Sequence, residues 1–457
     1  AVTGVQTCAL PIYDNELDGL FRMLFIKQCN ALNSVLPALF EKTNDFTELL
    51  MNVSFTDQDG VVYHLIHDIS EDDFNLSKEG QVEIIGWMYQ AYITEVNDMV
   101  YDGSMSKAKV PKELIPAATQ LFTPDWPIRY MVENSLGRLW QEGHPNDKVK
   151  SEWKYYLEEA EQEADVQKKM ESIYEEYKAI KPEDIKVIDP CMGSGHILVY
   201  AFEILMQIYE SYGYSQRDAA ISIVENNIFG LDIDNRAFQL AYFAVMMKAR
   251  QYNRRILSGE IKCKIYAIQE SNTINRDQLK YFGYGMSDFE RNSALNQIEN
   301  LLDTMCDAKE YGSILIIENV NWLLITNFVK NYDISGQMTI DTIGLDDTQK
   351  RLIQLVRIAE VMSQKYDVVV TNPPYLSSAR FSPKLSYYVK NKYVEVKSDL
   401  SMVMFKRVLD GFVAKNGFVS FITTSSWMFL RSFEAIREEV INNYQIESIV
   451  DFGTELF

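Results

Sequence analysis

The sequence predicts an α/β fold, in which helices surround a parallel sheet and a mostly helical region precedes it. Three segments support this prediction. Residues 185–200 combine a short apolar strand, a glycine-rich turn and an apolar helix, and residues 227–234 form a second apolar strand that ends in carboxylates. Residues 366–375, Tyr-Asp-Val-Val-Val-Thr-Asn-Pro-Pro-Tyr, contain a β-branched run typical of a strand buried on both faces. Two prolines, which cannot donate ladder hydrogen bonds, end that run.

Composition limits the possible function classes. The 457 residues are enough for two or three domains, and 44 basic against 65 acidic residues give a net charge of −21. Such a chain repels duplex DNA at long range, so contact with DNA would need a local basic patch or a partner segment. The five cysteines form no C-x-x-C pair and the four histidines no cluster, so we expect no disulfide framework and no metal site. No apolar run reaches the roughly 18 residues of a membrane span, and we therefore expect a cytoplasmic protein without a membrane partner.

The first 118 residues divide into two parts. Residues 1–12 resemble the translation of a common sequencing adapter and are predicted to be an artefact; they lack the basic start of a signal peptide. Residues 13–118 are predicted to form a helical N-terminal domain. Helical spacing of apolar residues indicates two amphipathic helices within 20–39 and another within 81–99. Nothing in this region indicates catalysis.

Residues 119–457 are predicted to form the catalytic domain. Near its start, Thr123 is expected to cap a helix that begins at Pro124. Helical insertions are predicted at about 140–184, where both charge signs are dense, and at about 273–362.

The glycine-rich turn, Asp-Pro-Cys-Met-Gly-Ser-Gly, predicts a cofactor site. Gly193 and Gly195 let the backbone approach a ligand, although a lone Gly-x-Gly is a weak signal and lacks the third glycine of the dinucleotide fingerprint. The next strand strengthens the prediction of a cofactor site, because in doubly wound folds an acidic residue at the tip of that strand holds ribose hydroxyls. We expect Asp232 to have this role and Asp234 to cap the helix that begins at Arg236.

Three further strands and one helix complete the expected domain. Residues 264–272 are predicted as the third strand, with Glu270 or Asn272 near a cofactor adenine. After the fourth strand at 366–370 come an amphipathic helix at 398–413 and strands at 417–426 and 444–453.

The Asn-Pro-Pro-Tyr sequence predicts the site of chemistry. Pro373 keeps Asn372 out of helical geometry, so an amide is presented at the carboxyl end of a strand. The Asn372 side-chain oxygen and the Pro373 carbonyl can accept both hydrogens of an exocyclic amine while Tyr375 stacks on its ring. From this motif alone, a proline turn that merely ends a strand remains an alternative.

The order of these motifs resembles a known family. A Thr-Pro helix start, Asp-Pro-Cys-Met-Gly-Ser-Gly-His, Gly-Leu-Asp-Ile-Asp and Asn-Pro-Pro-Tyr follow one another as in the gamma class of S-adenosylmethionine-dependent amino-methyltransferases of DNA. Segments 20–39, 130–140 and 425–433 resemble the PglX-type adenine methyltransferases of BREX phage-defence systems. The likeness covers essentially residues 15–457.

The resemblance implies a Rossmann-like methyltransferase sheet and site-specific N6 methylation of adenine in DNA. It implies S-adenosylmethionine as cofactor, DNA and other defence-system proteins as partners, and no metal. The implied catalytic residues are Asn372, Pro373, Pro374 and Tyr375. The implied cofactor-binding residues are Thr123, Pro124, Asp189, Pro190, Cys191, Gly193, Ser194, Gly195, Asp232 and Glu270.

The sequence departs from the family pattern in places. Met192 stands where relatives often carry a small residue, and the 401–404 segment lacks their usual aromatics, which leaves Met404 or Phe405 to pack the cofactor adenine. The family's seventh strand, inserted between the fifth and sixth, and its target-recognition domain are expected to be absent. We therefore expect a fragment that does not methylate a specific site by itself.

The segment after Asn-Pro-Pro-Tyr is predicted to face nucleic acid, because cations suit phosphates and rings suit stacking. Five basic residues stand there against one acid, Glu395, and four rings are interleaved with them. These nine residues are Arg380, Lys384, Lys390, Lys392, Lys397, Phe381, Tyr387, Tyr388 and Tyr393. An ordinary solvated loop is the alternative. Two alternatives to DNA methylation also stay open: a methyltransferase for RNA or a protein amide, and a non-catalytic cofactor-binding subunit that surveys DNA.

Overall fold

The structure is a computed structural model. It describes residues 14–40, 42, 53–74, 84–101, 108–121, 123–258, 261–318, 320–332 and 343–453. The segment predicted to be an adapter artefact, residues 1–12, lies outside the described residues.

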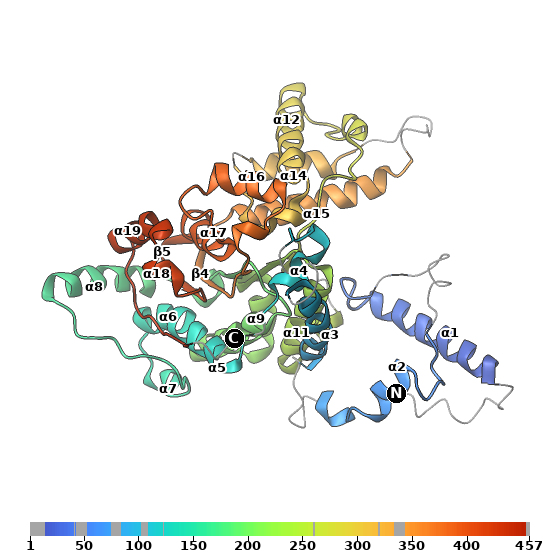
Figure 1. Ribbon diagram of the computed structural model, residues 1–457, viewed down its shortest axis with the longest axis horizontal. Helices are drawn as coiled ribbons and strands as arrows, with labels where there is room; N and C mark the ends of the chain where they lie inside the picture. Colours follow the sequence, from blue (N-terminus) through green and yellow to red (C-terminus); the bar gives the residue numbers. More distant parts are fainter. Residues whose placement is uncertain are drawn as a thin grey trace.

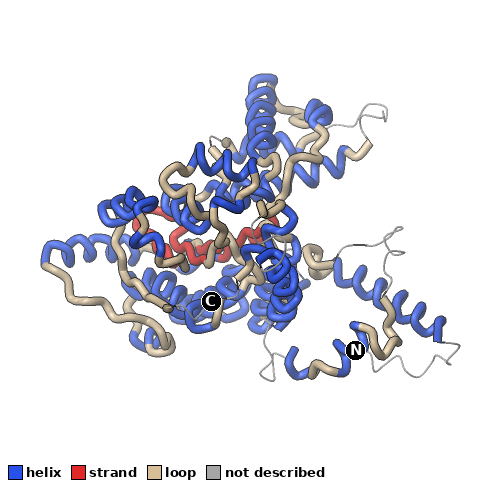
Figure 2. Tube along the Cα trace, viewed as in Figure 1, coloured by secondary structure: helices blue, strands red, loops and turns tan. Residues whose placement is uncertain are grey.

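A five-stranded sheet forms the centre of the molecule, and its strands, red in Figure 2, have helices on both sides. All neighbouring strands are parallel, in the order β3-β2-β1-β4-β5. The strands are β1 (Val187–Asp189), β2 (Ile228–Asp232), β3 (Lys264–Ala267), β4 (Tyr366–Thr371) and β5 (Val413–Phe421). The predicted α/β class is confirmed.

Alternate residues of the strands supply two separate cores. Val187, Ile228 and Val368 belong to one buried cluster, whereas Ile188 and Phe229 belong to the other. This is the two-residue period of a strand, and it requires a helical layer on each face.

One layer packs on the face of Val187. Its helices are α5 (Asp125–Val132), α6 (Arg138–Gly143), α9 (His196–Ser211), α10 (Gln216–Ser222) and α11 (Asn235–Tyr252). The other face is covered by α12 (Asp288–Thr304), α14 (Trp322–Lys330), α15 (Leu345–Ser363), α16 (Pro383–Lys392), α17 (Leu400–Arg407) and α19 (Glu434–Asn443). Helix α15 fills a covering position, since its buried Leu352 and Leu355 share a core with strand residues. It contacts β3 and directly precedes β4, and the bounds of the insertion at about 273–362 stay a prediction.

The described N-terminal residues are helical, as predicted, although the domain boundary at 118 remains a prediction. The helices are α1 (Asp14–Asn33), α2 (Val61–His67), α3 (Ile84–Tyr101) and α4 (Ile115–Thr119). In Figure 1, α1 and α2 lie to one side, apart from the sheet, whereas α3 contacts α4 and α11. The predicted pair of helices within 20–39 is instead one helix, α1, followed by turns.

The remaining helices are short or peripheral. They are α7 (Asp147–Lys150), α8 (Ala164–Lys178), α13 (Ala308–Tyr311) and α18 (Ser426–Phe429). Helix α8 extends outward in Figure 1, as its density of both charge signs predicts for a solvated helix.

The fifth strand begins four residues earlier than predicted. Asn416 has a left-handed φ of 60°, and the β4–β5 register shifts between Tyr366 and Val368. An irregularity therefore lies within β5, and the strand continues on both sides of it. The third strand is shorter than predicted, since β3 ends at Ala267.

The prediction of a strand at 444–453 is wrong for the described residues, which form no regular structure there. A strand needs a neighbour for its ladder hydrogen bonds. Instead of pairing with β5, this segment borders a cavity of about 1340 Å³ that β5 also lines. Side-chain contacts hold it: the Tyr130 hydroxyl donates to Ser448 Oγ at 2.8 Å, and the Phe452 ring meets the edge of Trp126.

Candidate active site

The predicted motifs meet at one edge of the sheet. Ile188 of β1 is in register with Phe229 of β2 and Val369 of β4, so the carboxyl ends of these three strands are neighbours. Strands β2 and β3 lie on one side of β1, whereas β4 and β5 lie on the other. The order of the strands therefore reverses at β1. Open α/β sheets bind ligands at such a point.

A buried hydrogen bond joins the first and fourth strands just before their motifs. Thr371 Oγ1 donates to Asp189 Oδ1 at 2.7 Å, and the backbone N–H of Cys191 donates to the same oxygen at 3.0 Å. Asp189 is 1% exposed and Thr371 is fully buried. Burial raises the pKa of Asp189 to about 7. The glycine-rich turn and the Asn-Pro-Pro-Tyr segment are thus held in fixed relation to each other.

Asp232 holds the glycine-rich turn. Its Oδ2 accepts from the backbone N–H of Gly193 at 2.9 Å, and its Oδ1 accepts from that of Asp234 at 2.8 Å. Burial raises the pKa of Asp232 to about 6. Asp234 caps α11 through the backbone N–H of Arg236, which confirms its predicted role.

Both glycines of the turn adopt a backbone conformation that favours glycine. Gly193 and Gly195 have φ values of +52° and +88°, in the left-handed region. At Gly195 a Cβ would also lie 2.8 Å from Ala241, whereas at Gly193 it would meet no atom within 4 Å. The turn is therefore packed tightly against α11 at Gly195, whereas the space beside Gly193 is open.

Met192, which stands where relatives often carry a small residue, fits into the packing beside the turn. Its side chain is 4% exposed, and a Cβ on Gly230 of β2 would lie 2.4 Å from its sulfur. The methionine fills space that the missing side chain at 230 leaves. Its carbonyl oxygen accepts from the backbone N–H of Gly195, closing the turn.

The Asn372 side chain bonds at both ends. Its Nδ2 donates to Thr123 Oγ1 at 2.9 Å, and its Oδ1 accepts from the Tyr375 hydroxyl at 2.8 Å. Burial raises the pKa of Tyr375, so the hydroxyl keeps its proton. Pro373 is buried, while Asn372 and Tyr375 are partly exposed, and Tyr375 lines the large cavity beside β5.

Thr123 does not cap the helix as predicted. The N-cap is Pro124, α5 begins at Asp125, and no side chain caps that end. The Thr123 hydroxyl, 7% exposed, accepts from Asn372 instead. The capping prediction failed because a tertiary partner takes the hydroxyl that a local pattern assigns to the helix end.

A family model, the Eco57I restriction-modification methylase, matches residues 226–457, which is just over half of the chain. The matched part includes the second strand, the Asn-Pro-Pro-Tyr segment and β5. The chain belongs to the Eco57I restriction-modification methylase family.

Two curated relatives match almost all of this chain. It is 40% identical over 471 residues to "Adenine-specific methyltransferase PglX" of Lacticaseibacillus casei (strain Zhang). It is 36% identical over 469 residues to "Adenine-specific methyltransferase BrxX" of Escherichia coli O9:H4 (strain HS). Each match covers 99% of this chain, which spans only 37% and 38% of the relatives' lengths. A solved DrdV–DNA complex is similar with a TM-score of 0.38 and 12% identity over 92% of this chain and 32% of that chain, too weak to support an inference.

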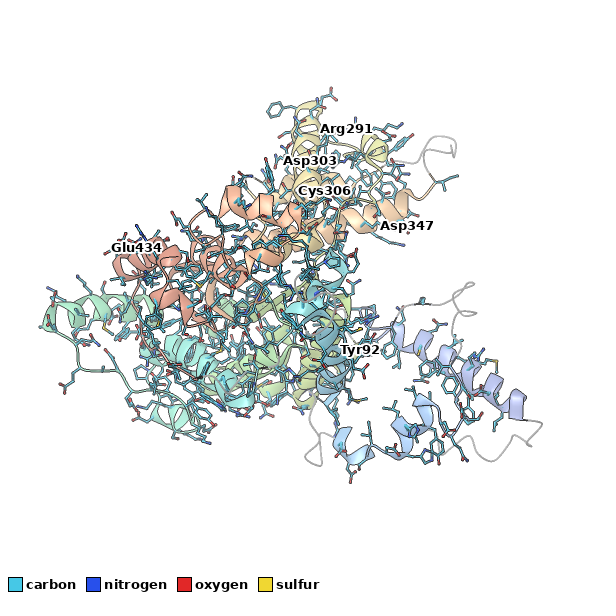
Figure 3. The ribbon with its side chains drawn as sticks, viewed as in Figure 1. Tyr92, Arg291, Asp303, Cys306, Asp347 and Glu434 are labelled. Atoms are coloured by element: carbon cyan, nitrogen blue, oxygen red, sulfur yellow. The ribbon has the colours of Figure 1, made fainter. Side chains whose placement is uncertain are left out.

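Helix α3 lies against the glycine-rich turn, a contact that the sequence analysis did not predict. A Cβ on Gly86 would lie 3.1 Å from Ser194 Oγ and from the His196 ring. Tyr89 donates a hydrogen bond to Asp234, and the Arg236 guanidinium lies 5.6 Å from the centre of the Tyr92 ring, labelled in Figure 3. Because Tyr89 and Asp234 are 145 residues apart, no local pattern could have signalled this contact.

Thr371 and Ser313 were also missed. Thr371 had a weak signal, a hydroxyl at the buried end of an apolar strand directly before the motif. Ser313 had none; its Oγ donates to the carbonyl oxygen of Pro190 at 2.7 Å and lies 3.9 Å from both Cys191 Sγ and Met404 Sδ. Met404 therefore lies on the side of the glycine-rich turn. Phe405 packs on Phe421 and Trp427 instead.

The other predicted cofactor residues differ in how they are placed. Ser194 lies in the turn with its Oγ 2.9 Å from His196 Nδ1. Glu270 lies beyond β3, where both of its oxygens accept from Lys112 Nζ at 3.0 Å. A role for Glu270 at the cofactor adenine stays a prediction, and its carboxylate is already paired. Asn272 Nδ2 donates to Asp307 Oδ1, and Asn272 Oδ1 accepts from the backbone N–H of Asp307.

The segment after Tyr375 is less exposed than predicted. Phe381 and Tyr393 are buried in the core, so they cannot stack on bases, and Tyr388 accepts from the backbone N–H of Ile316. Arg380 lies over the Tyr101 ring, and Lys384 pairs with Asp307. Interleaved cations and rings were predicted to face solvent, but Phe381 and Tyr393 flank α16 and join its inward-facing Leu385 and Val389 in the core. The exposed members are Lys384, Tyr387, Lys390, Lys392 and Lys397, of which Lys384 is paired with Asp307.

Two observations concern other classes of site. Within the described ranges, no three side chains of His, Cys, Asp or Glu are grouped so as to hold a metal ion. None of the helices in those ranges combines the length and apolar character needed to span a bilayer.

Proposed function

We propose that this chain carries the cofactor-binding and catalytic residues of a DNA methyltransferase that transfers a methyl group from S-adenosylmethionine to N6 of adenine, within a phage-defence system. The observation that carries the proposal is the Asn372 amide at the carboxyl end of β4. It is anchored through Thr371 to Asp189 and thus to the glycine-rich turn. The names of the two relatives support adenine as the acceptor.

The residues of the turn fit S-adenosylmethionine. This cofactor carries positive charge on its sulfonium and ammonium groups, and Asp189 and Asp232 supply two carboxylates at the strand ends. Each oxygen of Asp232 has a second lone pair beyond the backbone N–H that it accepts, so a ribose hydroxyl can still donate to it. Gly193 leaves open space where a side chain would stand. When bound, the cofactor supplies a methyl group activated by the positive sulfur.

The chain's own residues would hold the base. Adenine must leave the helical stack, because its amine cannot be reached inside a duplex. The Asn372 Oδ1 and Pro373 carbonyl oxygens then accept the two amine hydrogens, and Tyr375 stacks on the ring. These acceptors draw the nitrogen lone pair out of conjugation with the ring and aim it at the methyl group. The residues act by positioning and by prearranged dipoles, and no general base is needed to start the reaction.

A transfer assay with a labelled methyl donor tests the proposal. The protein is incubated with duplex DNA, with the same duplex in which purine replaces every adenine, with RNA and with a glutamine-containing peptide. We expect label only on adenine-containing DNA, spread over its adenines without a preferred site, and none with Asn372→Ala, which should still bind cofactor in calorimetry. Label on RNA or peptide would support the other acceptors. Cofactor and DNA binding without any transfer would support a non-catalytic surveillance subunit.

A further inference from the structure

An amide can serve the adenine amine only when its oxygen faces the base. The two ends of the Asn372 side chain differ chemically: the oxygen accepts hydrogen bonds, and the nitrogen only donates them. A side chain rotated by 180° would direct N–H groups at the amine hydrogens and repel them. The orientation of this one side chain therefore decides whether the site can bind its acceptor.

The structure orients the amide through two hydroxyls on opposite sides. Nδ2 points to Thr123, which is 7% exposed, and Oδ1 points to Tyr375 at the border of the cavity. Tyr375 occupies the acceptor only while no base is present, since its ring must stack on that base. Thr123 is therefore the partner that remains when the site fills.

We propose that Thr123 is a positioning residue for Asn372: its hydroxyl oxygen holds the amide nitrogen, so that the amide oxygen faces the acceptor amine. This inference rests on the proposed function. It adds to the cofactor role predicted for Thr123, because the hydroxyl that accepts from Asn372 still carries its own proton. A continuous chain of contacts then runs from the start of α5 through the end of β4 to the end of β1. It passes through Thr123, Asn372, Thr371 and Asp189.

Thr123→Val and Thr123→Ser separate the hydroxyl from the shape of the side chain. Valine keeps the volume and removes the acceptor, whereas serine keeps the acceptor. At saturating cofactor we expect Thr123→Val to lower kcat about 10- to 100-fold, because a misoriented acceptor misplaces the amine. Thr123→Ser should restore kcat to within about threefold. Thr119→Val, which removes a hydroxyl that donates within α4, should leave kcat unchanged.

A readout independent of activity is the side-chain amide signal of Asn372 in ¹⁵N-asparagine-labelled protein, assigned by its loss in Asn372→Ala. We expect Thr123→Val to shift this signal and speed its exchange with water, and Thr123→Ser to leave it near the wild-type position. If wild-type protein methylates nothing, the proposed function fails, yet the signal still tests the contact.

Two outcomes overturn the inference. In one, Thr123→Val leaves both kcat and the Asn372 signal as in the wild type. In the other, valine and serine lower kcat equally while the signal stays in place. If Thr123→Val fails to fold, the kcat and signal of Thr123→Ser decide: both near wild type support the inference, and a kcat more than tenfold lower overturns it.

Discussion

At Asp189 the needs of folding and of binding conflict. The carboxyl is buried beneath the sheet edge, and burial raises its pKa from 3.8 to about 7. The folded state therefore holds this proton more tightly than the unfolded chain. The resulting stability is fully present below pH 3.8 and is lost as the pH rises towards 7. At neutral pH a part of the Asp189 side chains is ionised and can attract a cation, and this ionisation lowers the stability of the folded state.

Asp189→Asn should therefore stabilise the protein and weaken cofactor binding. The amide oxygen can keep the bonds from Thr371 and Cys191, while the charge is removed. We expect a gain of ~1–3 kcal/mol at pH 8 and a smaller gain at pH 5, because the folded wild-type carboxyl is protonated below its pKa of about 7. Thermal unfolding at both pH values and calorimetry with S-adenosylmethionine check this. Equal stability changes at the two pH values would show that the carboxyl has an ordinary pKa.

Tyr375 carries a hydroxyl that competes with the proposed substrate. Its bond to Asn372 Oδ1 must break before an adenine amine can bind there. A neutral hydrogen bond contributes ~0.5–1.5 kcal/mol, so Tyr375→Phe should raise kcat/KM by about two- to tenfold. Tyr375→Ala, which also removes the ring, should lose most activity. Steady-state rates on adenine-containing duplex measure both; a phenylalanine variant as inactive as the alanine variant would show that the hydroxyl takes part in the reaction.

Residues of the candidate site that follow a local sequence pattern could be predicted, whereas contacts between distant residues could not. Asn372 and Asp232 could be predicted because a strand followed by a breaker or a carboxylate is a local pattern. The bond from Asn372 to Thr123 joins residues 249 apart in sequence, and only packing of α5 beside β4 creates it. Sequence analysis thus named Thr123 as a site residue and assigned its hydroxyl the wrong partner.

At the scale of elements, α3 covers the glycine-rich turn. Gly86 packs closely against this turn, since a Cβ there would lie 3.1 Å from Ser194 and His196. Gly86→Leu should push α3 away from the turn and weaken cofactor binding by on the order of 1 kcal/mol, about fivefold. Calorimetry with S-adenosylmethionine gives the measurement.

Gly19→Leu in α1 is the matched control, because a Cβ at that helical glycine would meet no atom within 4 Å. Both substitutions gain about 0.8 kcal/mol of helix propensity, so a difference between them reports the contact. Equal cofactor affinity in the two variants would mean that α3 does not cover the bound cofactor.

The strands show why element prediction succeeds in some places and fails in others. β4 is a β-branched run buried on both faces, and its sequence alone identifies it. Residues 444–453 were also predicted as a strand, yet the described segment borders a cavity and has no neighbouring strand. A hydrophobic pattern indicates which side chains are suited to burial. The hydrogen-bond ladder of a strand also needs a neighbouring strand, which the pattern does not specify.

For the whole molecule, charge is the property that matters for DNA. With a net charge of −21, the chain repels a polyanion unless cations are concentrated locally. Lys390, Lys392 and Lys397 are exposed at and beyond the end of α16. The groove of about 520 Å³ beside Lys397 also contains Arg431, but the carboxylates of Glu395, Glu434 and Glu438 line it as well. Any attraction here is therefore moderate and opposed by its surroundings.

Replacing Lys390, Lys392 and Lys397 together with glutamine tests whether this surface meets DNA. If all three contact phosphates, the slope of log affinity against log salt should fall by up to about 3, equally for every sequence. The change in net charge alone would weaken binding too. The control is therefore the same substitution at Lys27, Lys168 and Lys169, exposed residues of α1 and α8. Fluorescence anisotropy from 50 to 200 mM salt gives both slopes. Parallel lines for the two triple variants would show that only net charge matters and that DNA approaches elsewhere.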